Sequence, residues 1–359
     1  MQEFLVGGAI RDKILGIATE ATEKDYVVVG SSPEEMKSLG FLQVGKEFPV
    51  FLHPKSKEEY ALARLERKVG KGYKGFEFDT SKSVSLEQDL SRRDLTINAI
   101  AQNKDGSGDY IDPFGGLDDI KKRRLKHVSE AFTEDPVRIL RTARFASCLN
   151  HFGFSIDSGT LDLMKMMVNS GEVDALTPER VFKEINLSMN SQSPSIFFEV
   201  LIESGAYQRL FPMLEMTQTE NLKLLDQQDL TSEVTFALWL YDQKPSNIGL
   251  LCEHLKCPKD LQNIAELVSI WHDFASDFLS HEPEEILNFY LKTDGLRRQK
   301  RFELILYTFE SLNIDTAFLV QLKTQLNSIK ISDLNNINIA QELAEERLSV
   351  ICRFIDSAK

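Results

Sequence analysis

Two carboxylates, Glu23 and Asp25, stand two residues apart where the chain enters the apolar run Tyr26–Val29. Side chains at positions i and i+2 of a β-strand point to the same side, so these carboxylates are expected to face one point. Hard oxygen ligands placed in this way suit Mg²⁺ held between a protein and the phosphates of a substrate. Solvated acids at the end of a strand would give the same pattern, so the pair alone leaves both interpretations open.

A pair of glycines precedes these carboxylates. The apolar residues 4–6 predict a short strand, Gly7 and Gly8 close it, and a helix is expected to follow. Because glycine has no side chain, a phosphate can approach the backbone N–H groups at the start of such a helix. Arg11 lies one turn into the helix, where its guanidinium can reach the same anion. An ordinary glycine turn is the alternative.

A second polar segment runs from Arg92 to Asn98. Arg92 and Arg93 precede Asp94. Their two guanidinium groups could bind a triphosphate, while Asp94 and Asn98 could form hydrogen bonds with a sugar. The same residues would also form a helix with a salt-bridged polar face. The segment therefore predicts either a nucleotide site or a surface helix.

Asp135 and Arg138 stand at the start of a predicted helix, with Pro136 at a plausible first helical position. Residues three apart in a helix are neighbours on one face, so the carboxylate and the guanidinium are expected to lie together. An aspartate before proline is also an ordinary helix N-cap. The pair is therefore compatible with a recognition site and with a simple cap.

The predicted elements divide the chain into a sheet region and a helical region. Five apolar runs predict the strands of a small mixed sheet: residues 4–6, 26–29, 41–44, 50–53 and 59–64. The glycine-rich basic stretch 64–86 is typical of a mobile loop or of a surface hairpin. Ser32 before Pro33 predicts the start of a helix. From residue 134 onward helical patterns dominate, and they include residues 197–210, 261–274, 298–312 and 339–354. A chain of 359 residues is too long for one ordinary core, so two or three domains are expected.

Composition indicates a soluble globular protein. Hydrophobic residues make up 42% and charged residues 27% of the chain, and no run of about 18 apolar residues occurs. The first residues lack the pattern of a signal peptide, so the cytoplasm is the expected location. The four scattered cysteines favour reduced thiols over a disulfide framework. Because the net charge is −13, a polyanion would have to be held by local basic patches such as residues 121–126.

Six motifs follow one another along the chain: GGAIRD, EKD before a strand, RRDLTINA, DYIDPFGG, EDPVRILRTARF and LTPERVFKE. In this order they resemble the class II tRNA nucleotidyltransferases, the family of bacterial CCA-adding enzymes. The resemblance runs from the first residues to about Pro212. It implies an α+β fold, in which an N-terminal polymerase-beta-like nucleotidyltransferase head, with a small mixed sheet and helices, is followed by an all-helical neck, body and tail.

The resemblance implies a division of labour along the chain. Residues 1–125 would be the catalytic head, residues 126–190 the neck that recognises the base, and residues 191–359 the body and tail that bind tRNA and contain a degenerate His-Asp-type region. The implied activity is template-independent addition of CCA to the 3′ end of tRNA from CTP and ATP by two-metal nucleotidyl transfer with Mg²⁺. The expected partners are tRNA, CTP and ATP, and neither a membrane nor a stable protein partner is expected.

The motif matches also assign roles to residues. Glu23 and Asp25 would bind the catalytic metal ions, with Glu59 as a possible third carboxylate on a neighbouring strand. The nucleotide would be bound by Gly8, Arg11 and Arg93 at its phosphates, Asp94 and Asn98 near its ribose, Asp135 and Arg138 at its base, and Arg141 as a further contact. The stretch 65–85 resembles the flexible loop that lets this family switch from C to A.

Two positions depart from the family pattern. Glu23 stands where the family normally has aspartate, and its extra methylene shifts the carboxylate. Tyr241-Asp242 stands where relatives with a metal-dependent phosphohydrolase domain carry His-Asp, and His272-Asp273 follows later without companion ligands. We therefore expect no hydrolytic activity, because tyrosine cannot replace a neutral imidazole as a metal ligand at ordinary pH.

Several related functions stay open. A-adding and CC-adding enzymes are partial-specificity relatives; the basic loop argues against a CC-only enzyme but does not separate CCA addition from A addition. Poly(A) polymerase shares the motifs, although a long basic C-terminal extension is expected there and this chain ends acidic. A weakened tRNA-binding factor of the same fold is the non-enzymatic alternative, and Glu23 is the feature that favours it.

Overall fold

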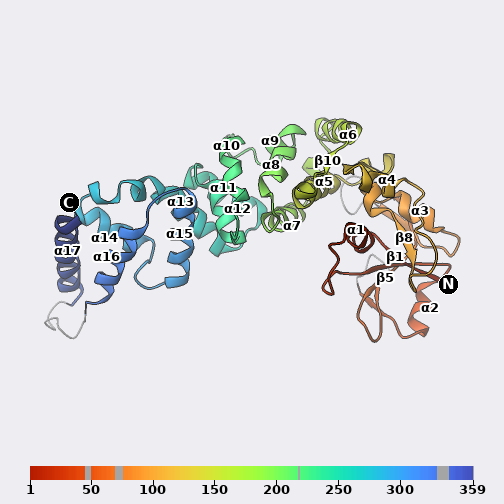
Figure 1. Ribbon diagram of the computed structural model, residues 1–359, viewed down its shortest axis with the longest axis horizontal. Coiled ribbons are helices and arrows are strands. Elements are labelled where there is room, and N and C mark those ends of the chain that lie inside the picture. The colour runs from red at the N-terminus through yellow and green to blue at the C-terminus, as the bar shows by residue number, and fades with distance from the viewer. Residues whose placement is uncertain (45–49, 69–75, 217–218, 330–338, 359) are drawn as a thin grey trace. The chain divides into compact units, whose positions relative to one another are not determined.

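The computed structural model describes residues 1–44, 50–68, 76–216, 219–329 and 339–358. The chain forms two compact units, Met1–Leu210 and Phe211–Lys359, and each is described by itself (Figure 1). None of the helices within the described ranges combines the length and the apolar character that crossing a membrane requires.

The first unit contains a mixed sheet that has six strands among the described residues, in the order β3-β4-β5-β2-β1-β8. β1 pairs antiparallel with β2 and β8, β2 pairs parallel with β5, and β4 lies antiparallel between β5 and β3. The bounds are Gln2–Val6 (β1), Asp25–Val29 (β2), Leu42–Val44 (β3), Val50–Leu52 (β4), Glu59–Leu62 (β5) and Ala101–Asn103 (β8). The predicted small mixed sheet is confirmed.

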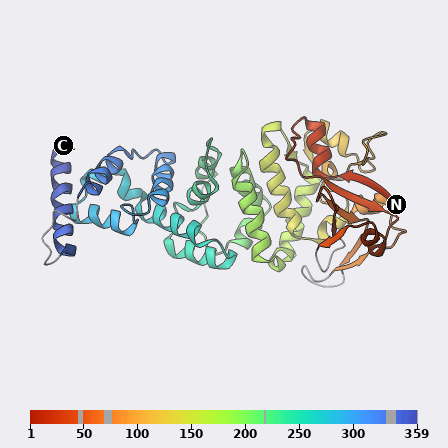
Figure 2. The same ribbon diagram turned by 90° about the horizontal axis from the view of Figure 1, so that it is seen from below.

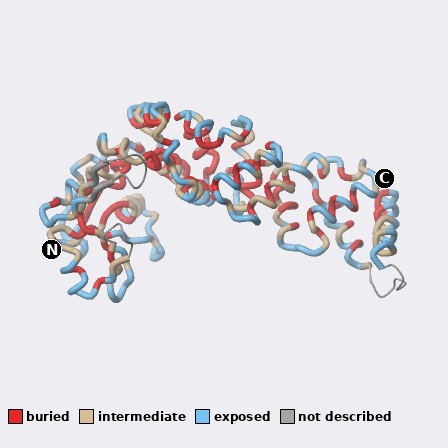
Figure 3. Tube along the Cα trace, turned by 180° about the vertical axis from the view of Figure 1, so that it is seen from behind, coloured by how far each residue is buried: buried red, intermediate tan, exposed pale blue. Residues whose placement is uncertain are grey.

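The two faces of this sheet enter two hydrophobic cores. The face that carries Val6 and Val27 packs with Leu90 of α3 (Leu86–Ser91), whereas the face that carries Tyr26 and Val28 packs with Met36 of α2 (Pro33–Ser38). Neighbouring residues of β2 thus belong to opposite cores, as the two-residue period of a strand requires. Buried residues follow the strands and the inner sides of the helices (Figure 3).

Capping residues begin the short helices next to the sheet. Ser32 caps α2 and Ser85 caps α3, and each accepts a hydrogen bond from the backbone N–H three residues later. The helix start predicted at Ser32 is confirmed. α1 (Gly8–Leu15) follows β1 directly, and α4 (Gly116–Lys121) begins after the turn at residues 112–115.

The glycine-rich stretch forms a hairpin where the structure describes it. β6 (Leu65–Lys68) pairs antiparallel with β7 (Phe76–Asp79). The predicted hairpin is confirmed by this pairing. A mobile loop was the alternative for the whole stretch 64–86, of which residues 69–75 lie outside the described residues.

The helix considered as an alternative for residues 92–98 is wrong. α3 ends at Ser91, and only Thr96–Asn98 form a short 3₁₀ turn. The cause is local, because the carboxylate of Asp94 accepts the N–H of Leu95 at 2.8 Å, and a side chain that bonds its neighbouring backbone competes with helix formation.

Helices complete the first unit. A 3₁₀ turn (Glu130–Glu134) leads into α5 (Val137–Leu149), which begins one residue after the expected proline and packs against α7 and α8. The helix predicted over residues 197–210 is interrupted at Gly205, whose φ of 79° places it in the left-handed region that ends helices. The remaining elements are β9 (Arg124–Leu125), parallel to β10 (Ser155–Ile156), α6 (Ser158–Asn169), α7 (Pro178–Met189), α8 (Pro194–Glu203) and α9 (Ala206–Leu210).

The second unit is built from helices (Figure 2). They are α10 (Thr219–Leu222), α11 (Ser232–Leu240), α12 (Pro245–Leu255), α13 (Lys259–Ser276), α14 (Pro283–Lys292), α15 (Gln299–Ser311), α16 (Ala317–Asn327) and α17 (Ile339–Ala358). The helices predicted around residues 261–274, 298–312 and 339–354 are confirmed as α13, α15 and α17. Tyr241 follows α11, with its ring centroid 5.4 Å from that of His272. The expected lack of hydrolytic activity stays a prediction.

Gly116 is the point at which α4 approaches the backbone most closely. A Cβ at this position would lie 2.2 Å from the carbonyl oxygen of Thr96. We predict that Gly116→Ala destabilises the protein by about 1–3 kcal/mol, the usual cost of overpacking, and lowers the melting temperature by several degrees.

Gly249 of α12 is the matched control, because its nearest neighbour, Oε1 of Glu266, would be 3.5 Å from the new Cβ. Gly249→Ala should leave the melting temperature unchanged or raise it slightly, since alanine favours helix. Thermal melts followed by circular dichroism check both variants. A Gly116→Ala protein as stable as the wild type would contradict the close approach.

Candidate functional site

Polar residues from separate motifs line one cavity of the first unit, with a volume of about 730 Å³. The described residues around it include eight arginines and five acidic residues. The arginines are Arg11, Arg64, Arg92, Arg93, Arg138, Arg141, Arg144 and Arg180, and the acids are Asp12, Glu23, Asp25, Asp94 and Asp135. Because positive charge is in excess, this lining suits an anionic ligand. Every predicted site residue except Glu59 lies on this wall.

The glycine turn forms one part of the wall. Gly7 has φ 76° and ψ −137°, a conformation that is strained for residues with a side chain. A Cβ at Gly7 would also lie only 3.0 Å from Nη1 of Arg93. The predicted Gly8, the first residue of α1, lines the cavity too. Gly7, which was expected with Gly8 in the phosphate turn, lines the cavity as well.

Glu23 and Asp25 both line the cavity, but the predicted reason for their proximity is wrong. β2 begins at Asp25, so Glu23 precedes the strand and the strand period does not orient it. Both residues are exposed. Within the described parts of the chain, neither carboxylate makes a side-chain hydrogen bond or an ion pair.

The electrostatics of Asp25 favour a bound cation. Desolvation raises the pKa of Asp25 above its ordinary value, Arg93 and Arg141 lower it, and the charge of Glu23 raises it. Asp25 is disfavoured as an anion beside the charge of Glu23, and two neighbouring carboxylates with no hydrogen-bonded cation are a donor set for a divalent metal. The residues present therefore fit such an ion.

Glu59 lies beside this pair. It is opposite Asp25 in the parallel register of β2 and β5, as predicted for a neighbouring strand. Its side chain lines an adjoining hollow of about 400 Å³, which Glu23 and Asp25 also reach. Across the residues that the structure describes, no three acidic, histidine or cysteine side chains converge as a metal site. The protein thus offers the carboxylates of Glu23 and Asp25 as a pair of possible metal ligands, and not a complete set of ligands.

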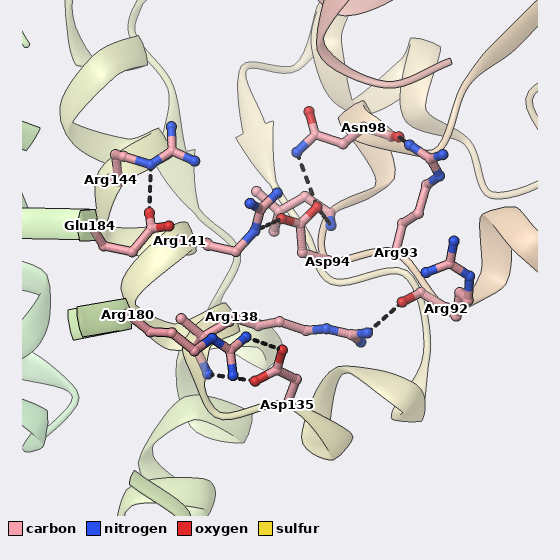
Figure 4. Close-up of polar contacts among 12 residues, drawn as sticks. Arg92, Arg93, Asp94, Asn98, Asp135, Arg138, Arg141, Arg144, Arg180 and Glu184 are labelled. Atoms are coloured by element: carbon pink, nitrogen blue, oxygen red, sulfur yellow. Dashed lines mark hydrogen bonds and ion pairs between the residues drawn. The ribbon is translucent and has the colours of Figure 1, made fainter. Parts of the chain in front are cut away.

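A hydrogen-bonded chain joins four of the predicted residues, and Figure 4 labels three of them, Asp94, Asn98 and Arg141. Arg11 donates from Nη1 to Oδ1 of Asn98 at 2.8 Å, and Asn98 donates from Nδ2 to Oδ1 of Asp94 at 3.1 Å. Nε of Arg141 lies 2.7 Å from Oδ2 of Asp94. Burial would raise the pKa of Asp94, but the charge of Arg141 and these hydrogen bonds hold it well below its usual range. Asp94 is therefore an ionised carboxylate at neutral pH.

Arg92 and Arg93 are also held in place by hydrogen bonds and ion pairs. Nη1 of Arg93 donates to the carbonyl oxygen of Asn98 at 3.3 Å. Arg92 and Arg93 both form ion pairs with the buried Asp89, which does not line the cavity. Sequence reasoning missed Asp89, although its spacing of three and four residues from the arginines is typical of helical ion pairs.

Asp135 and Arg138 lie on the same wall, but they use different partners (Figure 4). Asp135 accepts the N–H of Val137 at 3.1 Å, which is the expected capping bond, and its Oδ2 lies 2.6 Å from Nη2 of Arg180. Arg138 is buried and donates to the carbonyl oxygens of Ala131 at 2.6 Å and Arg92 at 2.5 Å. The capping role of Asp135 is thus observed, and Arg180 of α7 is a neighbour that the prediction missed.

Phe145 of α5 gathers three guanidinium groups around its ring. The Cζ atoms of Arg11, Arg141 and Arg144 lie 5.1, 5.5 and 4.4 Å from the ring centroid, within the range of cation–π contacts. Arg144 also pairs with the buried Glu184 of α7, Nε to Oε2, at 2.6 Å. The aromatic ring and α7 therefore fix arginines that no single motif brings together.

Two family descriptions match parts of the chain. Residues 3–126 match the family described as the poly A polymerase head domain. Residues 153–217 match the family described as the probable RNA and SrmB-binding site of polymerase A. The first match contains the glycine turn, the carboxylate pair and the segment 92–98.

Similar proteins extend over most of the chain. A CCA-adding enzyme of Coxiella burnetii is 48% identical over 322 residues, which cover 88% of this chain and 83% of that protein. A multifunctional CCA protein of Shewanella frigidimarina is 43% identical over 356 residues, covering 89% of this chain and 85% of that protein.

Solved structures share the fold. A Thermotoga maritima CCA-adding enzyme complexed with tRNA is 19% identical with a TM-score of 0.70, covering 100% of this chain and 92% of that one. A CCA-adding enzyme in complex with ATP is 22% identical with a TM-score of 0.71, covering 99% and 88%. Given identities of 48% and 43% over more than four fifths of the chain, this protein belongs to the family of CCA-adding enzymes.

Proposed function

We propose that this protein adds C, C and A to the 3′ end of tRNA from CTP and ATP without a nucleic-acid template. The observation that carries the proposal is one cavity in which a glycine turn, an excess of arginines and two carboxylates without ion pairs among the described residues meet. Nucleotidyl transfer needs cationic groups at the phosphates and carboxylates for a divalent metal. The names of the similar proteins support the same activity.

We assign the parts of the chain as the motifs imply. Residues 1–125 are the catalytic head, which the match to a polymerase head domain over residues 3–126 supports. Residues 126–190 are the neck that recognises the base, and residues 191–359 bind tRNA with a degenerate His-Asp-type region. The cytoplasm, where tRNA, CTP and ATP meet, is the proposed place of action.

The phosphates of the nucleotide are assigned to the glycine turn and its arginines. Gly7 and Gly8 leave room for an anion at the start of α1, and Arg93 lies directly beside this turn. Arg11 is held by Asn98 and Asp12, so its guanidinium is oriented before a ligand arrives. These cations also stabilise the charge that develops on the leaving pyrophosphate.

The ribose is assigned to Asp94 and Asn98. Asp94 already accepts hydrogen bonds from Leu95, Asn98 and Arg141. A carboxylate offers about four acceptor sites, so one remains for a ribose hydroxyl. Because Asp94 is ionised at neutral pH, it can act as such an acceptor.

A divalent metal, with Mg²⁺ as the expected ion, is assigned to Glu23 and Asp25. Held by Glu23 and Asp25, such an ion would supply activation of the primer hydroxyl and withdrawal of charge from the triphosphate. Two carboxylates suit Mg²⁺, which proteins usually bind through one or two carboxylates together with substrate phosphates. Glu59 can add a third carboxylate from the adjoining strand.

The base is assigned to Asp135, with Arg138 beside it. Cytosine and adenine carry an exocyclic amine where uracil and guanine carry a carbonyl, so a carboxylate acceptor favours C and A. Only part of the acceptor capacity of Asp135 is taken by Val137 and Arg180. At least two N–H groups of Arg138 already serve backbone carbonyls, which leaves it fewer donors for a base.

The range of nucleotides added separates full CCA addition from the partial activities. We expect the protein to extend tRNA transcripts that end before CCA, after C and after CC, with CTP and ATP supplied singly and together. If the protein extends only the transcript that ends in CC, it is an A-adding enzyme. If extension stops after CC has been added, it is a CC-adding enzyme. Long adenosine tails would indicate a poly(A) polymerase. The absence of any extension would indicate a tRNA-binding factor.

Removing the charge of Asp25 should separate activity from stability. We predict that Asp25→Asn lowers incorporation by on the order of a hundred- to a thousandfold, the scale of losing one charge-stabilising group. Because the folded-state pKa of Asp25 is raised, its contribution to stability falls as the pH rises through that value. The metal-free melting temperature at neutral pH should therefore not fall.

Glu23→Asp is the control for this prediction, because it keeps the charge and restores the residue usual in the family. This variant should remain active. Primer extension and thermal melts test both variants. Wild-type incorporation by Asp25→Asn would remove Asp25 from the metal site.

The choice of nucleotide distinguishes base recognition by Asp135 from a role as a helix cap alone. We predict that Asp135→Ala incorporates UTP or GTP, because each base contact contributes about 1–3 kcal/mol of discrimination. If Asp135 were only a cap, the substitution would lower stability by about 0.5–2 kcal/mol and keep the preference for C and A. Incorporation of all four nucleotides, measured beside a thermal melt, distinguishes these outcomes.

Asp157 offers a matched control. It caps α6 by accepting the N–H of Gly159 at 3.1 Å, and it lies 3.8 Å from Arg124. Its side chain is 22% exposed, against 23% for Asp135. Asp157→Ala should therefore lose similar stability without any change in nucleotide choice. Equal nucleotide preferences in the two variants would exclude base reading by Asp135.

A further inference from the structure

We propose that Asp89 is a positioning residue that fixes Arg92 and Arg93 for the triphosphate and ties them to Arg64, at the start of the β6–β7 hairpin. The inference rests on the proposed function, because it concerns the phosphates of that nucleotide. Asp89 lies in α3, outside the cavity, whereas all three of its partners line the cavity. It therefore acts through other residues.

The contacts of Asp89 converge on one carboxylate. Its Oδ1 accepts hydrogen bonds from Nη2 and Nε of Arg92 at 2.7 and 3.1 Å, and from the backbone N–H of Arg64 at 3.3 Å. Its Oδ2 lies 3.5 Å from Nη2 of Arg93. Donors from two separate segments of the chain thus share one anion.

Because it is buried, the carboxylate of Asp89 depends on its ion pairs and hydrogen bonds. Asp89 is 0% exposed, and a buried ion is tolerated only when it is paired and hydrogen-bonded. Burial by itself would raise the pKa of Asp89, but the charges of Arg92 and Arg93 hold it below its usual value. Asp89 is thus ionised at neutral pH, and its geometry dictates where the two guanidinium groups can lie.

The two arginines need such an anion. They are adjacent in sequence, and burial and the charge of Arg92 lower the pKa of Arg93, whereas the charge of Asp89 raises it. Without the shared carboxylate, like-charge repulsion would move the guanidinium groups apart and toward solvent. Nη1 of Arg93 lies beside Gly7, 3.0 Å from where a Cβ would stand, so such a movement would take this guanidinium away from the glycine turn.

The bond to Arg64 extends this effect to another strand. Arg64 follows β5, whose first residue, Glu59, is opposite Asp25. It also directly precedes β6 of the hairpin. Asp89 therefore joins the phosphate arginines to the end of β5, from which the side chain of Arg64 contributes to the cavity lining.

Inorganic tripolyphosphate tests the inference without a base or a sugar. We expect Asp89→Asn to weaken tripolyphosphate binding, measured by calorimetry, by about tenfold, the scale of losing a hydrogen bond to a charged group. The KM values for CTP and ATP should rise by the same factor, while the preference for C and A over U and G stays unchanged. Unchanged or tighter tripolyphosphate binding would overturn the proposal, because Asp89 would then merely neutralise the arginines.

Asp119 is the matched control for a purely structural effect. It is 2% exposed, accepts Nε of Arg124 and Oγ1 of Thr96, each at 2.6 Å, and does not line the cavity. Asp119→Asn should lower the melting temperature comparably but leave tripolyphosphate binding as in the wild type. If Asp119→Asn weakens that binding as much as Asp89→Asn does, the positioning role is contradicted.

A second variant keeps the test decisive if Asp89→Asn does not fold. Asp89→Glu keeps the charge but moves the carboxylate by one methylene, so weaker tripolyphosphate binding is again expected. Wild-type affinity in Asp89→Glu would overturn the proposal. Binding of tripolyphosphate does not require nucleotide transfer. Failure of tRNA extension by the wild type would therefore refute the proposed function and leave this measurement interpretable.

Discussion

Eight arginines line one cavity of the first unit, and such a concentration of like charge is stable only because carboxylates are interleaved with it. Buried acids pair with four of these arginines. Asp94 pairs with Arg141, Glu184 pairs with Arg144, and Asp89 serves two arginines at once. The fold around the cavity follows from these pairs, because each one joins segments whose backbones must then stay in place.

These ion pairs fix the orientation of the arginine side chains and also balance their charge. A guanidinium that bonds to a buried carboxylate on one edge presents its other edge to the cavity in a set orientation. The site is therefore organised before a ligand enters, which lowers the reorganisation required during the reaction. By contrast, Glu23 and Asp25 are exposed and make no ion pair within the described chain, so the cavity combines a rigid cationic wall with an open anionic pair.

Local patterns were sufficient to predict the elements that hold this site. The strand, glycine turn and helix at residues 4–15, the capping serine at Ser32 and most strands follow from neighbouring residues alone. Glu23 shows the limit of that reasoning, because the strand period applies only from Asp25 onward. Residues 92–98 show another limit, since the side chain of Asp94 competes with the helix that the charge pattern suggested.

Long-range pairs could not be predicted in this way. Asp135 and Arg180 are 45 residues apart, and neither neighbourhood indicates the other. Asp89 looks like one more surface acid of a polar helix until its burial is known. The family motifs identified which residues lie at the site, but they did not reveal that Asp135 bonds to Arg180 or that Arg138 donates to backbone carbonyls.

The sequence separation of these ion pairs also bears on how the protein is made. Synthesis proceeds from the N-terminus at about 5–20 residues per second, so Asp94 leaves the ribosome before Arg141 exists, and Arg144 precedes Glu184 by 40 residues. Until its partner has been made, each of these charged groups has to remain hydrated. The nascent sheet can form early, but its cavity wall can close only after α7 has emerged. The emergence of residues 178–189 therefore sets the earliest point in translation at which this wall of the cavity can be complete.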